Sequence, residues 1–365
     1  MNPVDPAGID TPIGYVDLER VRANAQRVAD YAAQHGIAWR PHIKTHKSLE
    51  VARIQLEAGA RGLTVATLRE AEVMATLTND LLLAYPPVGD AKLERLVRLP
   101  MSLDLKVALD SSDVLESVAA ASAAADRVIG ILVEQDVGLG RVGVQSSAEV
   151  VRLASLASSL DGVEFVGLMF YPGHIRVQKD EQTEALALVF EQLTDTYAAL
   201  ESAGFTAGIV SGGSTPTLWQ SHAFPGLTEI RSGSCIFFDR EGLALGVASH
   251  DDLAYTVLAT VVSTAVPGHA VVDSGSKALA KESRGDGGFG VLFDHPGVLL
   301  ESLSEEHGVL DLSRTDWRPV IGERVRIVPN HVCVSVNLQE ALLAKDRDAH
   351  SMLTLEGRGR GPWTG

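Results

Sequence analysis

The chain has 365 residues, which suits a barrel-sized domain together with a second, smaller one. Hydrophobic residues make up 45% and charged residues 21%, a composition that excludes a disordered chain. The formal net charge of −16 argues against nucleic acid or an anionic membrane as a partner, because both would need a basic face. No apolar run reaches the ~20 residues of a membrane helix, and residues 1–12 show no secretory pattern. We therefore expect a cytoplasmic protein in which Cys235 and Cys333 are reduced.

From residue 15 to about residue 239, short apolar runs alternate with helical patterns. Eight or nine such βα units favour a (β/α)₈ barrel of the TIM type over an open doubly wound sheet. The expected strands are residues 14–17, 38–44, 62–67, 81–85, 105–110, 128–136, 165–171, 207–211 and 229–238.

Beyond residue 250, Val, Thr and Ser dominate and strict alternation replaces the helical period. This pattern predicts an antiparallel β domain with almost no helix. Its expected strands are residues 255–266, 269–273, 297–303, 325–328 and 352–356. The predicted domains are therefore a barrel over residues 1–245 and a β domain over residues 246–365. The closing segment G-R-G-R-G-P-W-T-G is too rich in glycine to order on its own.

The second expected strand ends in R-P-H-I-K-T-H-K, residues 40–47. Lys44 lies there among Arg40, His42 and His46. Neighbouring positive charge and partial burial would lower the pKa of Lys44 and make its amine a nucleophile able to form a Schiff base. A solvated basic turn is the alternative reading of the same residues.

The expected strand at residues 207–211 runs into V-S-G-G-S-T-P-T. Adjacent glycines allow a nest of inward-pointing backbone N–H groups, and flanking hydroxyls add donors, so the loop can cradle a phosphate. An ordinary tight turn would use the same residues. The candidate phosphate-binding residues are Ser211, Gly212, Gly213, Ser214 and Thr215.

Other polar groups follow further strands: Arg141, Tyr171 with His174, and Arg231 with Gly233. Each arginine alone could simply pair with a carboxylate. Taken with Lys44 and the phosphate loop, they supply an aldehyde partner, a phosphate site and contacts to a phenolic oxygen and a ring nitrogen. Pyridoxal 5′-phosphate needs this set of groups.

In the β domain, R-I-V-P-N-H-V-C-V-S-V-N-L places His331 and Cys333 two residues apart. On the strand expected here, both side chains would point to the same side. Such a pair can bind Zn²⁺ or a similar ion, with water or substrate completing the shell. A buried cysteine beside a histidine that bonds a backbone carbonyl is the alternative.

These motifs, with G-L-G-R-V-G-V, Y-P-G-H and P-N-H-V-C-V-S-V-N-L in the same order, resemble the D-threonine aldolase / D-serine dehydratase family. Its members are fold-type III pyridoxal-phosphate enzymes related to alanine racemase. The resemblance implies a homodimer in which a β domain covers the partner's active site. It makes Lys44 the Schiff-base lysine, Arg141 the contact to the phenolic oxygen and Arg231 the contact to the ring nitrogen. It also implies that His331 and Cys333 hold a divalent metal, Zn²⁺, Mn²⁺ or Mg²⁺, beside the cofactor.

The reaction implied is a lyase reaction on a D-β-hydroxy amino acid. Retro-aldol cleavage of the D-threonine aldolase type, giving glycine and an aldehyde, is favoured. Dehydration of D-serine or D-3-hydroxyaspartate to a 2-oxo acid and ammonia is the alternative, and a cofactor-free sugar-phosphate aldolase or a pyridoxal-phosphate carrier fits the motifs less well. The candidate bases are His42, His46, Tyr171 and His174.

Overall fold

The computed structural model describes residues 4–285 and 287–365, and these residues form two compact units. The sheet unit contains the chain up to Ala25 together with Ser234–Leu355. The barrel unit contains Gln26–Gly233 together with Glu356–Gly365. The division at 233/234 differs from the expected boundary at 245/246, because the segment after Gly233 bonds within the sheet unit. One such bond runs from the backbone N–H of Ala254 to the carbonyl of Phe237, at 2.8 Å.

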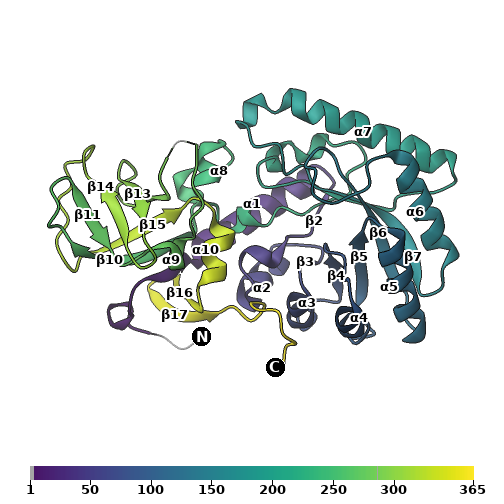
Figure 1. The fold of residues 1–365 in the computed structure, drawn as a ribbon, viewed down its shortest axis with the longest axis horizontal. Coiled ribbons are helices and arrows are strands. Elements are labelled where there is room, and N and C mark those ends of the chain that lie inside the picture. The colour runs from purple at the N-terminus through teal and green to yellow at the C-terminus, as the bar shows by residue number, and fades with distance from the viewer. Residues whose placement is uncertain (1–3, 286) are drawn as a thin grey trace. The chain divides into compact units, whose positions relative to one another are not determined.

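The barrel unit is built on eight parallel strands in the order β2-β9-β8-β7-β6-β5-β4-β3, with helices on the outside (Figure 1). A parallel bridge between His42 and Thr64 joins the two ends of this sheet. The strands are β2 (Ala38–Trp39), β3 (Leu63–Val65), β4 (Asp80–Leu83), β5 (Asp104–Leu109), β6 (Ile129–Gln135), β7 (Val163–Phe170), β8 (Ile209–Gly212) and β9 (Glu229–Ile230). The helices are α1 (Leu18–Gln34), which begins in the sheet unit, α2 (Leu49–Glu57), α3 (Leu68–Met74), α4 (Asp90–Val97), α5 (Ser112–Ala124), α6 (Ser147–Ser159) and α7 (Thr183–Ser202).

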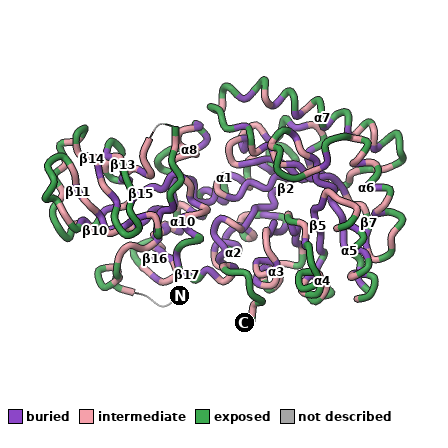
Figure 2. Tube along the Cα trace, in the orientation of Figure 1, coloured by how far each residue is buried: buried purple, intermediate pink, exposed green. Residues whose placement is uncertain are grey.

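Burial follows from this arrangement, since a parallel strand covered on both faces has to be apolar throughout. All seven residues of β6, I-G-I-L-V-E-Q, are buried. Leu82, Ala108, Leu132 and Met169, from four adjacent strands, form one buried cluster. Figure 2 shows the barrel strands as buried and the outer turns of α4 and α7 as exposed. The expected barrel is confirmed.

The sheet unit is built on nine strands in the order β11-β14-β13-β12-β15-β10-β1-β16-β17. All pairs are antiparallel except β1 with β16. The strands are β1 (Ile13–Asp17), β10 (Tyr255–Ser263), β11 (His269–Val272), β12 (Gly290–Leu292), β13 (Leu299–Leu303), β14 (Gly308–Asp311), β15 (Arg324–Pro329), β16 (Ala341–Asp346) and β17 (Ala349–Thr354). Three short helices accompany them: α8 (Arg240–Ala244), α9 (Ser276–Leu279) and α10 (Val332–Leu338).

Assigning residues 14–17 to the barrel was wrong. Strand β1 pairs with β10, with Gly14 opposite Val257, and with β16, with Gly14 opposite Leu342. A five-residue apolar run predicts a strand but carries no information about its partners. The burial of β1 alternates, as suits a sheet with one covered face rather than a barrel strand covered on both.

The glycine-rich tail, residues 356–365, is held by the barrel unit rather than by its own structure. The Glu356 carboxylate accepts the N–H of Leu49 (3.0 Å) at the start of α2, and the N–H of Gly357 donates to the carbonyl of Lys47 (2.8 Å). Further along, the N–H of Trp363 donates to the carboxylate of Glu72 (2.7 Å). Within the described part of the chain, no helix has the length and apolar character needed to cross a membrane.

A buried ion cluster ties β2, β4 and β9 together, with Arg40 directly after β2 and with Asp80 and Glu229 as the first residues of β4 and β9. The Arg40 guanidinium is fully buried and lies 2.9 Å from Glu229 and 2.5 Å from Asp80, and Lys106 contacts the same aspartate at 2.7 Å. Burial raises the pKa of Asp80, but the bonds from Arg40 and Lys106 outweigh it and hold this pKa below its usual value. Arg40 was expected to add positive charge beside Lys44. Its charge is instead neutralised by two carboxylates, so it stabilises the barrel.

Replacing Arg40 with Met should destabilise the barrel unit by about 3 kcal/mol or more, because Glu229 and Asp80 would lose their shared partner inside the protein. Urea denaturation followed by tryptophan fluorescence measures this loss. The matched control is Arg98→Ala, which removes an exposed pair with Glu94 and should cost at most about 0.5 kcal/mol. Equal, small effects of both changes would contradict a structural role for the cluster.

Candidate active site and metal centre

The residues expected to bind the cofactor follow barrel strands at their carboxyl ends. Lys44 follows β2, Arg141 follows β6, Tyr171 follows β7, and Arg231 follows β9. Because the strands are parallel, these ends meet at one rim of the barrel. The loops after β8 and β9, the last two strands of the barrel, lie where barrels of this type commonly bind phosphate.

Lys44 lies on a 3-10 turn, Ile43–Thr45, rather than at the end of the long strand expected for residues 38–44. The strand stops at Trp39, and the ring of His42 caps the turn by accepting the N–H of Lys44 (3.5 Å). The Lys44 Nζ atom lies 5.9 Å from the centre of the Tyr171 ring. Lys44 is partly exposed, which leaves its amine accessible.

His42 is a poor candidate for a base that works near neutral pH. Burial and the nearby charges of Lys44, Arg231 and Lys47 hold the pKa of His42 well below its usual value. The ring is therefore neutral, and it caps the turn that carries Lys44. His42 therefore stabilises the turn that carries Lys44.

Two cations at the rim approach the ring of Tyr171. The Arg141 guanidinium carbon lies 5.1 Å from the centre of its ring, on the same ring that Lys44 approaches. His174 is exposed and packs against Gly138 in the loop that carries Arg141, so close that a Cβ there would lie 3.1 Å from its ring. Lys44 and Arg141 thus both approach the ring of Tyr171, while His174 lies against the loop that carries Arg141.

The glycine loops after β8 and β9 are tightly packed. Gly213 has φ +81°, a left-handed conformation that favours glycine, and a Cβ on Gly233 would lie 2.3 Å from the carbonyl oxygen of His42. Ser214 is used within its own loop, where its hydroxyl lies 3.0 Å from the hydroxyl of Thr217. Gly212 is the last residue of β8, and Gly213 and Thr215 follow it in the loop.

Two buried polar atoms at this rim have no hydrogen-bond partner among residues 4–285 and 287–365: Ser211 Oγ and Arg231 Nε. Another nitrogen of Arg231 donates to the carbonyl of Phe170 (2.6 Å), so the guanidinium is fixed while Nε stays unpaired. Burial lowers the pKa of Arg231, against the raising effect of Glu134 and Glu229. Unpaired buried donors cost free energy, and they mark a place where a ligand can accept a hydrogen bond.

Sequence reasoning missed Glu134, a buried carboxyl on β6. Burial raises its pKa, while Arg231 and Arg141 act in the opposite direction. The sequence signal that could have found it is a single acidic residue inside the apolar run I-G-I-L-V-E-Q. A charged group in a fully buried strand needs partners, and this need indicates a site nearby.

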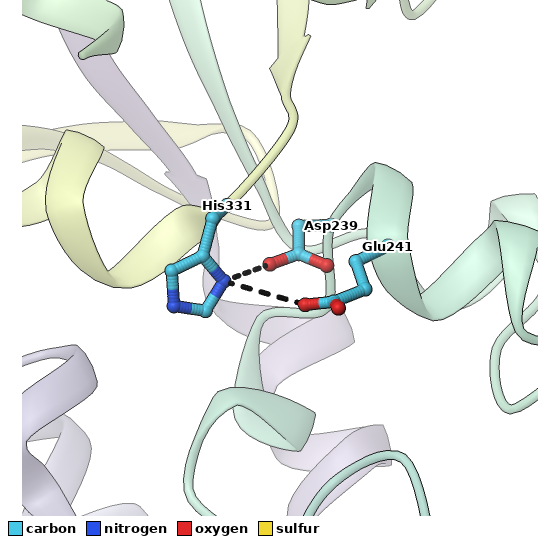
Figure 3. A group of neighbouring side chains, drawn as sticks. All are labelled: Asp239, Glu241 and His331. Atoms are coloured by element: carbon cyan, nitrogen blue, oxygen red, sulfur yellow. Dashed lines mark hydrogen bonds and ion pairs between the residues drawn. The ribbon is translucent and has the colours of Figure 1, made fainter. Parts of the chain in front are cut away.

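In the sheet unit, His331 lies among acidic groups (Figure 3). Its Nδ1 atom is 3.1 Å from the Asp239 carboxylate and 3.9 Å from that of Glu241. Burial lowers the pKa of His331, but hydrogen bonds with Asp239 and Cys333 outweigh it and raise this pKa to about 11. His331 therefore interacts with Cys333, and the structure places Asp239 and Glu241, which the sequence did not single out, beside His331.

The expected strand under this pair was wrong, because residues 332–338 form helix α10 with His331 as its N-cap. The alternation V-C-V-S-V predicts a strand, yet the same residues also fit a helical face. Val332, Ser335 and Val336, spaced three and four apart, are buried, and Ser335 bonds the carbonyl of Ala278 (2.9 Å). Tertiary contacts override the strand preference of valine here.

The chain matches two protein-family models, one after the other along its length. The model "Alanine racemase, N-terminal domain" matches residues 16–241, and "Putative serine dehydratase domain" matches residues 254–344. The D-threonine aldolase of Arthrobacter sp is 33% identical over 98% of this chain and 95% of its own length. The chain belongs to the D-threonine aldolase / D-serine dehydratase family.

Further relatives agree with this family. The D-threo-3-hydroxyaspartate dehydratase of Delftia sp. (strain HT23) is 33% identical over 90% of this chain and 92% of its own. The crystal structure of D-threonine aldolase from Filomicrobium marinum matches with a TM-score of 0.90 and 31% identity, over 98% of this chain and 99% of that one. The family's fold implies pyridoxal 5′-phosphate as cofactor.

The residues present fit that cofactor. Arg231 Nε and Ser211 Oγ are buried and unpaired, so they can serve its ring nitrogen and its polar substituents. The partly exposed Lys44 offers the amine for its aldehyde. The imidazole of His331 interacts with the thiol of Cys333, and both are ligand types for divalent metals. The carboxylates of Asp239 and Glu241 lie close to the same imidazole.

His46, another candidate base, is buried and supports α2. Its Nδ1 accepts the N–H of Ser48 (3.1 Å), so the proton of the neutral ring is on Nε2, which bonds Gln55 (3.0 Å). Burial lowers the pKa of His46 to about 3. The group is therefore neutral in the folded protein and cannot contribute to catalysis as an exposed base.

His46 should make the protein sensitive to acid. The unfolded chain binds a proton near pH 6.5 and the folded one only near pH 3, so stability is present above pH 6.5 and falls as the pH is lowered between these values. At pH 5 the loss should be about 2 kcal/mol from this residue. Urea denaturation of the parent and of His46→Gln at pH 7 and pH 5 measures it. Equal acid losses in the two proteins would contradict the assignment.

Proposed function

We propose that the protein is a pyridoxal-phosphate-dependent lyase of D-β-hydroxy amino acids, with retro-aldol cleavage to glycine and an aldehyde as its main reaction. The observation that carries the proposal is the group at the barrel rim. Lys44 and Arg141 both contact Tyr171, and the same rim carries the unpaired Nε of Arg231. The whole-length similarity to a D-threonine aldolase supports the substrate class.

Each residue at the rim has a separate task. Lys44 would hold the cofactor through its aldehyde, Arg231 would serve the ring nitrogen, and Arg141 would hold the phenolic oxygen. Residues 211–215, with Gly233, hold the phosphate. When bound, the cofactor takes up the electron pair that is released when a bond at the substrate's α-carbon breaks.

Tyr171 and His174 are the proposed bases for the substrate's hydroxyl proton. The Lys44 Nζ atom and the Arg141 guanidinium both approach the Tyr171 ring, at 5.9 and 5.1 Å from its centre, so its hydroxyl belongs to the group of residues at the rim. His174 is exposed and lies on the same rim. Both groups can exchange protons with solvent, whereas His42 is held neutral in the interior.

His331 and Cys333 are the proposed metal ligands. The ion would lower the pKa of the substrate's β-hydroxyl, as bound cations do for water. A thiolate favours Zn²⁺, and Mn²⁺ or Mg²⁺ are the other candidates. We also propose a cytoplasmic homodimer, which sedimentation of the purified protein and cell fractionation would test.

Dehydration to a 2-oxo acid and ammonia is the second candidate. The Delftia dehydratase is as similar in sequence, at 33% identity, as the aldolase is. The reaction depends on which bond at the α-carbon is aligned with the cofactor ring. Incubation with D-threonine and with D-serine, followed by analysis for glycine, 2-oxobutyrate and pyruvate, separates the two reactions.

Lys44→Ala should lose the covalently held cofactor, because the variant lacks the amine that would bind its aldehyde. The visible absorbance of the purified protein and the borohydride-reduced peptide report the change. Lys277→Ala is the control, since this exposed lysine pairs with Glu306 in the sheet unit and should keep both signals. A reduced cofactor still attached to a lysine of the Lys44 variant would assign the role elsewhere.

Cys333→Ala should remove the metal and abolish turnover, while the visible absorbance of the lysine-bound cofactor stays. Treatment with EDTA should have the same effect in the parent protein. Cys235→Ala is the matched control: burial raises the pKa of the Cys235 thiol to about 12, so it stays protonated and is a poor ligand. Full activity of a metal-free preparation would contradict the metal's role.

A further inference from the structure

The Asp239 carboxylate makes three hydrogen bonds in the sheet unit. Its Oδ1 accepts the N–H of Gly242 (3.0 Å) as the N-cap of α8. Its Oδ2 accepts the N–H of Val332 (2.9 Å) at the start of α10 and lies 3.1 Å from Nδ1 of His331. The side chain of Asp239 is only 6% exposed, while that of His331 is 28% exposed. A buried carboxylate therefore joins the caps of two helices and the imidazole.

This bonding pattern argues against Asp239 as a direct metal ligand. A carboxylate oxygen has two lone pairs, and both of those on Oδ2 are used by N–H donors. Metal binding at Nδ1 of His331 would also require the loss of its hydrogen bond to Asp239. Figure 3 shows the other ring nitrogen, Nε2, on the side of the ring that faces away from both carboxylates.

We propose that Asp239 is a positioning residue, which keeps the proton of His331 on Nδ1 and presents Nε2 to the metal. A histidine ligand commonly donates its second N–H to a carboxylate, and this bond fixes both the tautomer and the orientation of the ring. Through the N–H of Val332, the same carboxylate fixes the first turn of α10, which carries Cys333. Asp239 thus orients both proposed ligands. The inference rests on the metal site in the proposed function.

Glu241, the second carboxylate beside His331, serves as the control for Asp239. It lies 3.9 Å from Nδ1 of His331, beyond hydrogen-bond distance, and its side chain is 19% exposed. Asp239 and Glu241 could instead bind an ion directly together with His331, since their ligand atoms lie within 4.8 Å of one another. If Glu241 binds the ion directly, its loss should weaken metal binding. If Asp239 only positions His331, the loss of Glu241 should have little effect.

The experiment measures zinc affinity of the cofactor-loaded protein by competition with a chromogenic chelator. Asp239→Ser keeps an N-cap residue for α8 but cannot reach His331. It should weaken zinc binding 10- to 100-fold. Asp239→Asn, whose remaining oxygen can still accept from Nδ1–H, should recover most of the affinity. Glu241→Gln should stay within about twofold of the parent, as expected for a group whose contact with the ring is a long ion pair of 3.9 Å and not a hydrogen bond.

A second measurement does not depend on the variants. In the zinc-loaded parent protein, a long-range ¹H–¹⁵N spectrum should show Nδ1 of His331 protonated and Nε2 bound to zinc. Metal on Nδ1 would overturn the proposal, as would parental affinity in Asp239→Ser or equal losses in Asp239→Ser and Glu241→Gln. Parental zinc affinity in Cys333→Ala would instead reject the metal site of the proposed function, so the two failures can be told apart.

Discussion

Parallel pairing of the eight barrel strands is the constraint on which the proposed site depends. Strands that all run in one direction place their carboxyl ends at one rim, whatever their order along the chain. Residues as far apart in sequence as Lys44, Arg141 and Arg231 therefore meet without any local signal that links them. The loops after these strands can vary in conformation, as the 3-10 turn of Lys44 does, because the buried strands fix where each loop begins.

Buried charged residues of the barrel unit differ in how completely they are paired. Next to β2, Arg40 is bonded to Glu229 and Asp80, and this saturated cluster serves stability. At the rim, Arg231 keeps one buried N–H unpaired, and Glu134 has its pKa raised by burial. Incomplete pairing costs stability, and proteins keep such groups mainly where ligands supply the missing partners.

In the sheet unit, polar residues of the candidate metal site lie at the N-terminal caps of helices. His331 and Asp239 each stand at the start of a short helix, and one carboxylate satisfies N–H groups of both. Helices this short have few internal bonds, so their position depends on such contacts. The candidate metal ligands are thus held by hydrogen bonds between segments that are 92 residues apart in the sequence.

The sequence by itself determined the barrel, the β-rich second unit and the family, and it supplied the candidate residues at the strand ends. Apolar runs and helical periods are local properties, and strand ends follow from them. Only the tertiary structure decided that β1 joins the second sheet, because a short apolar run does not encode its partners. It also decided that Arg40 and His46 are buried supports and that residues 332–338 form a helix. Partners such as Asp239 for His331 come from distant segments, and packing alone brings them together.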